Sequence, residues 1–370
     1  MKSILILLLL FIFSCTTKPE TGVEQIRIGF YGPLTGNMAS FGQMTKQGIE
    51  LAIAEANKTG KGARIELFSE DDRGNPEEAQ SAVTKLITKY RVMAVLGEPS
   101  SSGSLAGAPV CQRNGIPMIT PTATNPKVTE VGDYIFRVCW IDPFQGEIMA
   151  RFAVTSLRAK RIAILFDVTS DYSTGLTEVF ETTVRQLGGE IAKKASYSFG
   201  DTDFSAQLTA IHEVKPDAIY VPGYYNEAGL IVRQARRMAI ASVMLGGDGW
   251  DSPSLQEVAG ELLDNAYFCT HFFPGDPNAQ SFVQLFQKQY GDIPSAGGAL
   301  GYDAANLLLQ AIRSSAKLEP LQIRAAVADI RDFRGATGTI RFDSKRNAVK
   351  PAIVLRLDRG KASLAERINP

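Results

Sequence analysis

The sequence predicts an α/β protein made of two doubly wound lobes, each built on a parallel sheet. Short runs of β-forming residues alternate along the chain with helical patterns of roughly 12 to 18 residues, which is typical of sheets covered on both faces. At ~150 residues per domain, a chain of 370 residues is long enough for two or three folded units. A new series of strand and helix patterns starts around Arg137–Asp142, so we expect a hinge there.

The first residues of the chain predict export. Lys2 precedes the apolar run Ile4–Phe13, which is well short of the ~20 residues of a membrane-spanning helix and fits a signal peptide over residues 1–14. Ser14 and Cys15 end that run in a way that resembles a bacterial lipobox, so Cys15 is expected to be lipidated as the first mature residue. We therefore expect a periplasmic or cell-surface protein that contacts the membrane only through this lipid.

The charge balance excludes partners that are recognised by bulk charge. Lys plus Arg and Asp plus Glu are equal, at 39 each. Such a neutral chain has no basic surface with which to bind nucleic acid or an anionic membrane. We expect a small-molecule partner and no nucleic acid.

Strands and helices can be assigned in order along the chain. Helical spacing is clearest in Gln43–Asn57 and in Glu77–Tyr90, which Pro76 opens as a first-turn proline should. Strands are expected from short β-branched and aromatic runs at Ile26–Tyr31, Arg64–Phe68, Met93–Leu96, Arg161–Phe166, Ala218–Val221 and Val243–Leu245.

The two halves of the chain look like variants of one strand and helix plan. Strand Ile26–Tyr31 leads through a polar loop to Ser40-Phe41-Gly42, and strand Arg161–Phe166 leads in the same way to Asp171-Tyr172-Ser173. Ligands of open parallel sheets bind beyond the carboxyl ends of the strands. We therefore expect the site in a cleft between the lobes, on the loops that follow the strands.

Residues for catalysis, metal binding or a cofactor are scarce. The two histidines, His212 and His271, stand apart from any pattern with metal-ligand spacing, and the phosphate-binding and hydrolase nucleophile motifs are missing. A hydrolase that used the serine-rich loop would lack a placed base. We expect no enzyme activity, no metal and no cofactor. Cys111, Cys139 and Cys269 lie among apolar residues and predict small buried side chains.

Hydroxyl side chains concentrate in two loops of the first half. Four serines lie in residues 97–104, and one of them is expected to cap the following helix. The extra hydroxyls, together with free N–H groups at the helix start, suit a carboxylate. In the next loop Thr124 offers a further hydroxyl, and a backbone carbonyl at Thr122 or Ala123 could accept from an ammonium.

The second half offers Tyr172, Tyr224 and Asp248 after its own strands. A lone loop aspartate is more often a turn former. However, Asp248 lies between glycines after an apolar strand, where the local pattern does not require a carboxylate. As a functional residue it would be the counter-charge of a ligand cation, with the tyrosines as aromatic walls. An anion site in one lobe and a carboxylate in the other would suit a zwitterion.

Taken in order, these motifs resemble the leucine/isoleucine/valine-binding protein family, the substrate-binding proteins of branched-chain amino-acid ABC importers. The resemblance implies the type I periplasmic binding fold, with a hinge crossed three times, near Cys139, Thr270 and Phe342. The lobes would then comprise residues 24–139 plus 271–342, and 140–270 plus 343–370. The family resemblance extends from about Gln25 to about Leu357. The segments that carry it are Ile28–Gly36, Glu70-Asp71-Asp72, the serine loop, Pro121–Pro126, Tyr172–Gly175 and Gly223-Tyr224-Tyr225.

In the first lobe the resemblance implies a site for the ligand carboxylate. The family's carboxylate-binding serine matches Ser101, or Ser100 or Ser102 if the loop shifts by one residue. Its threonine, which touches both carboxylate and ammonium, matches Thr124, and the carbonyl-bearing residue matches Thr122.

In the second lobe the resemblance implies two cleft tyrosines and an acidic ammonium ligand, which match Tyr172, Tyr224 and Asp248. Leucine-type members carry glutamate where this chain has Asp248, and Phe41 falls where the family has an aromatic residue lining the side-chain pocket. The implied function is capture of an aliphatic or branched-chain L-amino acid for delivery to an ABC permease. A ligand-sensing module of the same fold, or a receptor for amides, urea or aromatic carboxylates, is the alternative.

Overall fold

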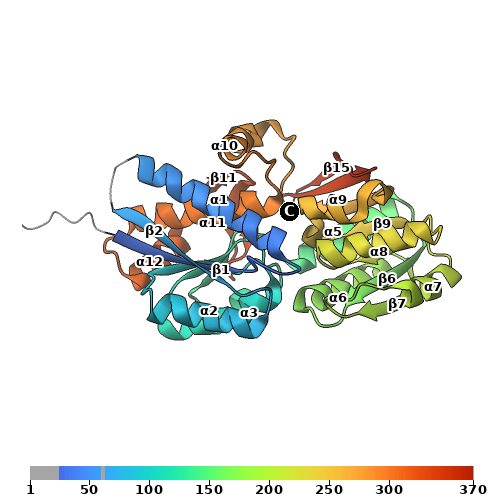
Figure 1. The fold of residues 1–370 in the computed structure, drawn as a ribbon, viewed down its shortest axis with the longest axis horizontal. Coiled ribbons are helices and arrows are strands. Elements are labelled where there is room, and N and C mark those ends of the chain that lie inside the picture. The colour runs from blue at the N-terminus through green and yellow to red at the C-terminus, as the bar shows by residue number, and fades with distance from the viewer. Residues whose placement is uncertain (1–24, 60–62, 370) are drawn as a thin grey trace, which may run out of the picture.

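A computed structural model describes residues 25–59 and 63–369; Cys15 and the expected signal peptide lie outside the described residues. Two separate sheets occupy the two halves of the elongated molecule (Figure 1). The first sheet is parallel throughout and has the order β2-β1-β3-β4-β5. Its strands are β1 (Gln25–Gly32), β2 (Arg64–Asp71), β3 (Ala94–Gly97), β4 (Met118–Thr120) and β5 (Ile135–Arg137).

Helices cover both faces of this first sheet, as a doubly wound fold requires. Side chains alternate along β1, so Ile28 and Phe30 pack with the core under α1 and α11, while Tyr31 packs on the opposite face. The first face carries α1 (Ala39–Lys58), α11 (Ala296–Ser314) and α12 (Pro320–Asp329), and the second carries α2 (Pro76–Thr88), α3 (Ser101–Asn114) and α4 (Lys127–Glu130).

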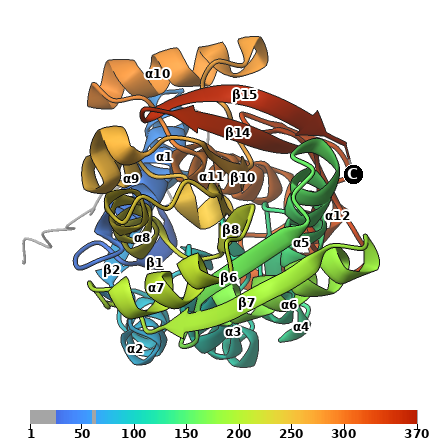
Figure 2. The ribbon, with the colours of Figure 1, turned by 90° about the vertical axis from the view of Figure 1, so that its right-hand side faces the viewer.

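The second sheet repeats this plan and adds an antiparallel edge. Its parallel part has the order β7-β6-β8-β9-β10, the same winding as the first sheet, which confirms that the halves share one plan. Strands β14 and β15 continue it antiparallel and form its upper edge in Figure 2. The bounds are β6 (Arg161–Asp167), β7 (Glu190–Tyr197), β8 (Ala218–Val221), β9 (Val243–Gly246), β10 (Ala266–Thr270), β14 (Ala352–Asp358) and β15 (Lys361–Ile368).

Five helices flank the second sheet, and smaller elements complete the chain. The helices are α5 (Asp142–Arg151), continued by the π-helical turn Phe152–Ser156, and α6 (Asp171–Gln186), α7 (Ser205–Glu213), α8 (Tyr225–Arg237) and α9 (Pro253–Ala259). Single 3₁₀ turns lie at Asp248–Trp250, Gly260–Leu262 and Pro277–Ala279. Helix α10 (Gln280–Tyr290) and the short strands β11 (Phe333–Gly335), β12 (Gly338–Phe342) and β13 (Ala348–Val349) belong to the return through the first half.

The chain passes between the sheets after β5, after β10 and before β14. The third passage was expected near Phe342. However, Ala348 packs in the core of the first sheet, and the Arg346 guanidinium donates to the carbonyls of Ile135 at 3.0 Å and Thr129 at 2.7 Å. These contacts hold residues 343–349 against the first half, so we propose that the third passage lies near Pro351.

The predicted fold class is confirmed, and every predicted strand is present. Helix α1 begins at Ala39, earlier than the Gln43 that the spacing predicted, and α3 begins within the serine loop, at Ser101, because serines are good first-turn residues as well as loop residues. Cys111, Cys139 and Cys269 are buried, as expected, and they are free. None of the helices in the described part of the chain combines the length and apolarity that a bilayer crossing needs.

Candidate functional site

The expected site residues come together where the carboxyl ends of the two sheets face each other. Ser101 and Thr124 follow β3 and β4 of the first sheet, and Tyr172, Tyr224 and Asp248 follow β6, β8 and β9 of the second. Phe41, in the first turn of α1, joins them from the first half. These six side chains are between 1% and 8% exposed, so the site is enclosed.

The three candidate serines have three different surroundings. Ser100 caps α3: its Oγ accepts from the Gly103 N–H at 3.2 Å and donates to Glu98 Oε2 at 2.5 Å, so the hydroxyl is fully used. Ser101 Oγ accepts from the Asn125 N–H at 3.2 Å, which leaves its own proton available to a ligand. Ser102 is partly exposed, and its Oγ donates to Asp171 Oδ2 at 2.9 Å in the opposite half.

The loop after β4 presents a free hydroxyl and a free carbonyl. The buried Arg137 guanidinium holds the loop by donating to the Ala123 carbonyl at 2.6 Å and the Asn125 carbonyl at 2.8 Å. Thr122 uses its hydroxyl to donate to the Pro99 carbonyl at 2.7 Å. In the described residues, Thr122 O accepts no hydrogen bond, and Thr124 Oγ1, although buried, has no partner. These are acceptor atoms that an ammonium would satisfy.

Asp248 is a buried carboxylate held by two neutral side chains. Gln145 Nε2 donates to its Oδ1 at 3.0 Å, and Gln145 Oε1 accepts from its backbone N–H at 3.0 Å. His271 Nε2 lies 3.3 Å from its Oδ2. Burial raises the pKa of Asp248 to about 6. Neither Gln145 nor His271 was predicted as a site residue, because each comes from a passage between the sheets and not from a loop after a strand.

Three aromatic rings wall the site. Tyr172 and Tyr224 stack with their centroids 5.2 Å apart, and Phe41 lies 5.8 Å from Tyr224 across the cleft. The Tyr172 hydroxyl accepts from the Gly249 N–H at 3.2 Å. Burial raises the pKa of both tyrosines well above the ordinary value, so their hydroxyls stay neutral.

The two halves are closed on each other around this site. On one side, Asn125 Nδ2 donates to the Asp171 carbonyl at 2.9 Å, next to the Ser102 contact. On the other, the Tyr225 hydroxyl donates to the Asn37 carbonyl at 2.8 Å, and the hydroxyls of Ser40 and Ser252 lie 2.8 Å apart. A cavity of about 340 Å³ lies at the seam beside Asp171 and is lined by both halves.

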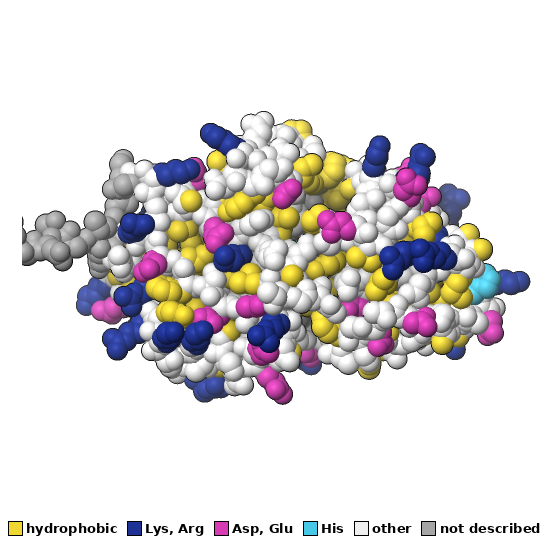
Figure 3. Space-filling model, in the orientation of Figure 1, with side chains coloured by type: hydrophobic (Ala, Val, Ile, Leu, Met, Phe, Trp, Pro, Cys, Tyr) yellow, Lys and Arg dark blue, Asp and Glu magenta, His cyan; other side chains and the backbone are white. Residues whose placement is uncertain are grey.

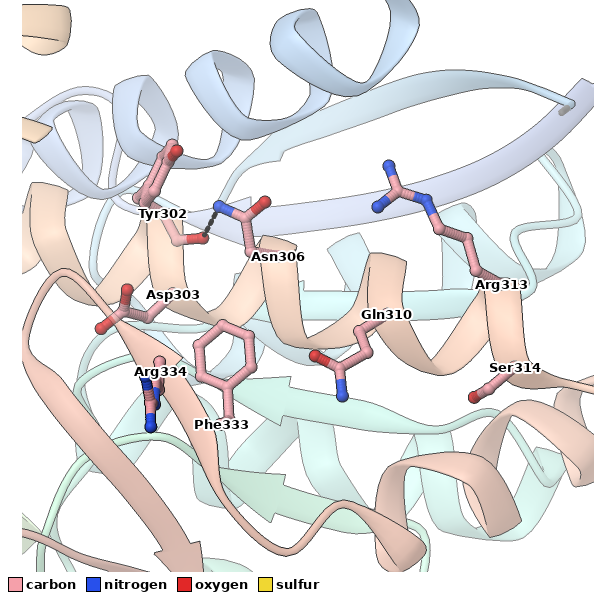
Figure 4. Close-up of a pocket in the computed structure, with 8 residues that line it drawn as sticks. All are labelled: Tyr302, Asp303, Asn306, Gln310, Arg313, Ser314, Phe333 and Arg334. Atoms are coloured by element: carbon pink, nitrogen blue, oxygen red, sulfur yellow. Dashed lines mark hydrogen bonds between the residues drawn. The ribbon is translucent and has the colours of Figure 1, made fainter. Parts of the chain in front are cut away.

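Other surface features lie apart from the site. The face in Figure 3 intersperses acidic and basic side chains, in keeping with the neutral composition. A groove of about 580 Å³ runs beside α11 and β11 (Figure 4), where Asn306 Nδ2 donates to the Tyr302 carbonyl at 3.0 Å. None of the predicted site residues lines it. Within residues 25–59 and 63–369, no three His, Cys, Asp or Glu side chains are grouped so as to hold a metal.

Comparison with known sequences assigns the chain to a protein family. A family model described as periplasmic binding protein matches residues 25–362. The chain belongs to this periplasmic binding protein family. Within it, the Leu/Ile/Val-binding protein homolog 2 of Brucella abortus (strain 2308) is 30% identical over 330 residues, which are 88% of each chain. A leucine-, isoleucine-, valine-, threonine- and alanine-binding protein of Pseudomonas aeruginosa is 28% identical over 326 residues, 87% of each chain.

Solved structures of periplasmic binding proteins superpose closely. The leucine binding protein LivK of Thermotoga maritima is 40% identical with a TM-score of 0.89, over 93% of this chain and 99% of that one. LivJ of Streptococcus pneumoniae, in complex with isoleucine, is 34% identical with a TM-score of 0.90, over 94% and 100%. A benzoate complex from R. palustris is 22% identical with a TM-score of 0.85, over 94% and 97%, and shares the fold. The expected family resemblance is confirmed.

Proposed function

We propose that this periplasmic binding protein captures a small zwitterion, an aliphatic or branched-chain L-amino acid, and delivers it to an ABC importer. The observation that carries the proposal is the combination of the buried Asp248 carboxylate in the second half with the unsatisfied Thr124 hydroxyl and Thr122 carbonyl in the first. The names of the relatives, which include Leu/Ile/Val-binding proteins, support the same ligand class. The ligand would be bound and released without chemical change.

Each part of the ligand would have its own partners. The carboxylate would accept from the Ser101 hydroxyl at the positive end of the α3 dipole. The ammonium would donate to the Thr122 carbonyl, Thr124 Oγ1 and Asp248. The aliphatic side chain would lie against the buried rings of Phe41, Tyr172 and Tyr224. Since these groups come from both halves, binding favours the closed state.

The remaining site candidates have other roles in this proposal. Ser100 serves as the helix cap, and Ser102 joins the two halves instead of contacting the ligand. We also propose that the chain is exported, that Cys15 carries a lipid anchor and that an ABC permease is its partner.

Receptors for aromatic carboxylates, amides or urea, and a sensing role, are the competing functions. A ligand without an amine would leave Asp248 buried without a counter-charge, which is costly by the general penalty for desolvated charges. The site is therefore better matched to an amino acid than to a simple carboxylate.

A thermal-shift screen against the L-amino acids, the corresponding deaminated carboxylates, amides and urea tests the proposal. At about 100 times Kd a ligand adds ~2.7 kcal/mol to the stability, a shift of several degrees. We expect one class of L-amino acid to shift the melting temperature, and Asp248→Asn to abolish that shift. Asp251→Asn, in the same loop but bonded to Thr270, is the matched control. A shift from amine-free ligands alone would contradict the proposal.

A further inference from the structure

The carboxylate of Asp248 is fastened to two of the three passages between the halves. Gln145 lies in α5, directly after the first passage, and His271 follows the last residue of β10, at the second. Both side chains are buried, at 0% and 2% exposure. The counter-charge at the site is therefore held by the segments that connect the halves, and not by its own loop alone.

The protonation state of the histidine follows from its surroundings. Burial lowers the pKa of His271 well below the ordinary value, so the ring is neutral. A neutral ring can hydrogen-bond a carboxylate only through a protonated nitrogen, and the contact of 3.3 Å therefore makes Nε2 the donor. The ring stacks on Trp140 with a centroid distance of 3.6 Å, which fixes its plane.

The orientation of the glutamine follows in the same way. Its Oε1 faces the Asp248 N–H, so its NH₂ group must face the carboxylates. Gln145 Nε2 donates to Asp248 Oδ1 and to Asp142 Oδ1, each at 3.0 Å. One amide thus separates two buried carboxylates and supplies a donor to each.

We propose that Gln145 and His271 are positioning residues that make the site selective for ligands with an α-ammonium group. By donating to both oxygens of Asp248, they keep the carboxylate ionised and aimed at the ligand, in surroundings that would otherwise favour its neutral form. The inference rests on the proposed amino-acid function. Among the ionisable groups around Asp248 and its two partners, the Tyr172 hydroxyl also lowers the pKa of Asp248 by hydrogen bonding. The others are Cys139, Asp142, Tyr220, Tyr224, Asp251, Cys269 and Lys350.

A comparison of an L-amino acid with its deaminated analogue distinguishes the positioning role of Gln145 and His271 from a purely structural one. We would measure Kd for L-leucine, or for the L-amino acid with the largest thermal shift, and for its deaminated analogue, 4-methylpentanoate in the case of leucine. His271→Phe keeps the stacking on Trp140 and removes the donor, and Gln145→Met keeps the volume and removes the amide. We expect each variant to weaken L-leucine at least tenfold and 4-methylpentanoate less than twofold.

A conservative variant and a pH profile complete the test. His271→Gln should restore part of the affinity, because its amide can again donate to Asp248. In His271→Phe the pH below which L-leucine affinity falls should move upward, because the ionised carboxylate loses a donor. Equal weakening of both ligands, with an unmoved pH profile, would overturn the inference. If the unaltered protein binds no L-amino acid, the proposed function fails first, which is a distinct result.

Discussion

Ser102 and Asp171 exchange hydrogen bonds across the cleft. Ser102 Oγ donates to Asp171 Oδ2 at 2.9 Å and accepts from the Asp171 N–H at 3.2 Å. The two residues lie at the starts of α3 and α6, which belong to different halves. The contact exists only when the halves are closed, so it stabilises the closed state whatever the ligand is.

Removal of this contact should change affinity without changing selectivity. We predict that Ser102→Ala weakens L-leucine and L-leucinamide by the same factor, corresponding to less than about 1 kcal/mol, because the bond is partly exposed to solvent. Isothermal titration with the two ligands measures it. A loss confined to L-leucine would instead make Ser102 a carboxylate ligand.

In contrast to Ser102→Ala, Ser101→Ala should weaken the two ligands unequally. Its hydroxyl proton is not used within the described residues, and the Asn125 N–H bond orients the oxygen. We predict a loss of about 1–3 kcal/mol for L-leucine, and a clearly smaller loss for L-leucinamide, which lacks the charged carboxylate. Ser100→Ala serves as a control for the loop: it should lower the melting temperature through the lost helix cap while ligand discrimination stays unchanged.

The sequence patterns predicted the site residues in the loops after the strands, but not the residues that hydrogen-bond to them from other elements. Tyr172, Tyr224 and Asp248 were predictable because the alternation of strand and helix places each of them at the same edge of one sheet. Gln145 contacts Asp248 across 103 positions, and its helical pattern carries no sign of that partner. The sequence around His271 indicates no role for this residue, because a buried donor to one carboxylate has no sequence motif.

The sequence patterns also did not predict the antiparallel edge of the second sheet. Strands β14 and β15 run antiparallel and are joined by a tight turn, so no helix follows β14 to mark it as part of a strand and helix unit. The sequence also showed no sign of the close contact between α1 and α11. Gly48 fits the helical spacing of α1, but it must be glycine because a Cβ at this position would lie 1.9 Å from the Gly298 carbonyl oxygen of α11.

Ligand affinity should depend on pH below neutrality. Because burial in the closed cleft raises the pKa of Asp248 to about 6, its carboxylate becomes protonated in the closed protein as the pH falls through that value. Only the ionised form attracts an ammonium, so affinity should be constant above about pH 7 and fall by up to about tenfold per pH unit below pH 6. Titrations from pH 5 to 8 measure the profile. Asp248→Asn should flatten it, and constant affinity down to pH 5 would contradict the ammonium role.

Asp142 allows the cost of the second buried carboxylate to be measured directly. Burial raises the pKa of Asp142 to about 7. A carboxyl whose pKa is raised by folding binds more protons in the folded than in the unfolded state between about pH 4 and 7, so its contribution to stability falls as the pH rises through that window. Asn at this position keeps an acceptor for Gln145 Nε2 and removes the charge.

We therefore predict that Asp142→Asn stabilises the ligand-free protein at pH 8, by on the order of 1–3 kcal/mol, and leaves it nearly unchanged at pH 4.5. The pKa of Asp142 is a balance: burial and the nearby Asp248 carboxylate raise it, while hydrogen bonding from Gln145 and attraction to Arg137 lower it. Urea unfolding at the two pH values measures it. Asp133→Asn is the control of opposite sign, because the hydrogen bond from Gln112 and the nearby Arg324 lower the pKa of Asp133. Destabilisation by Asp142→Asn at both pH values would mean that folding favours the ionised form.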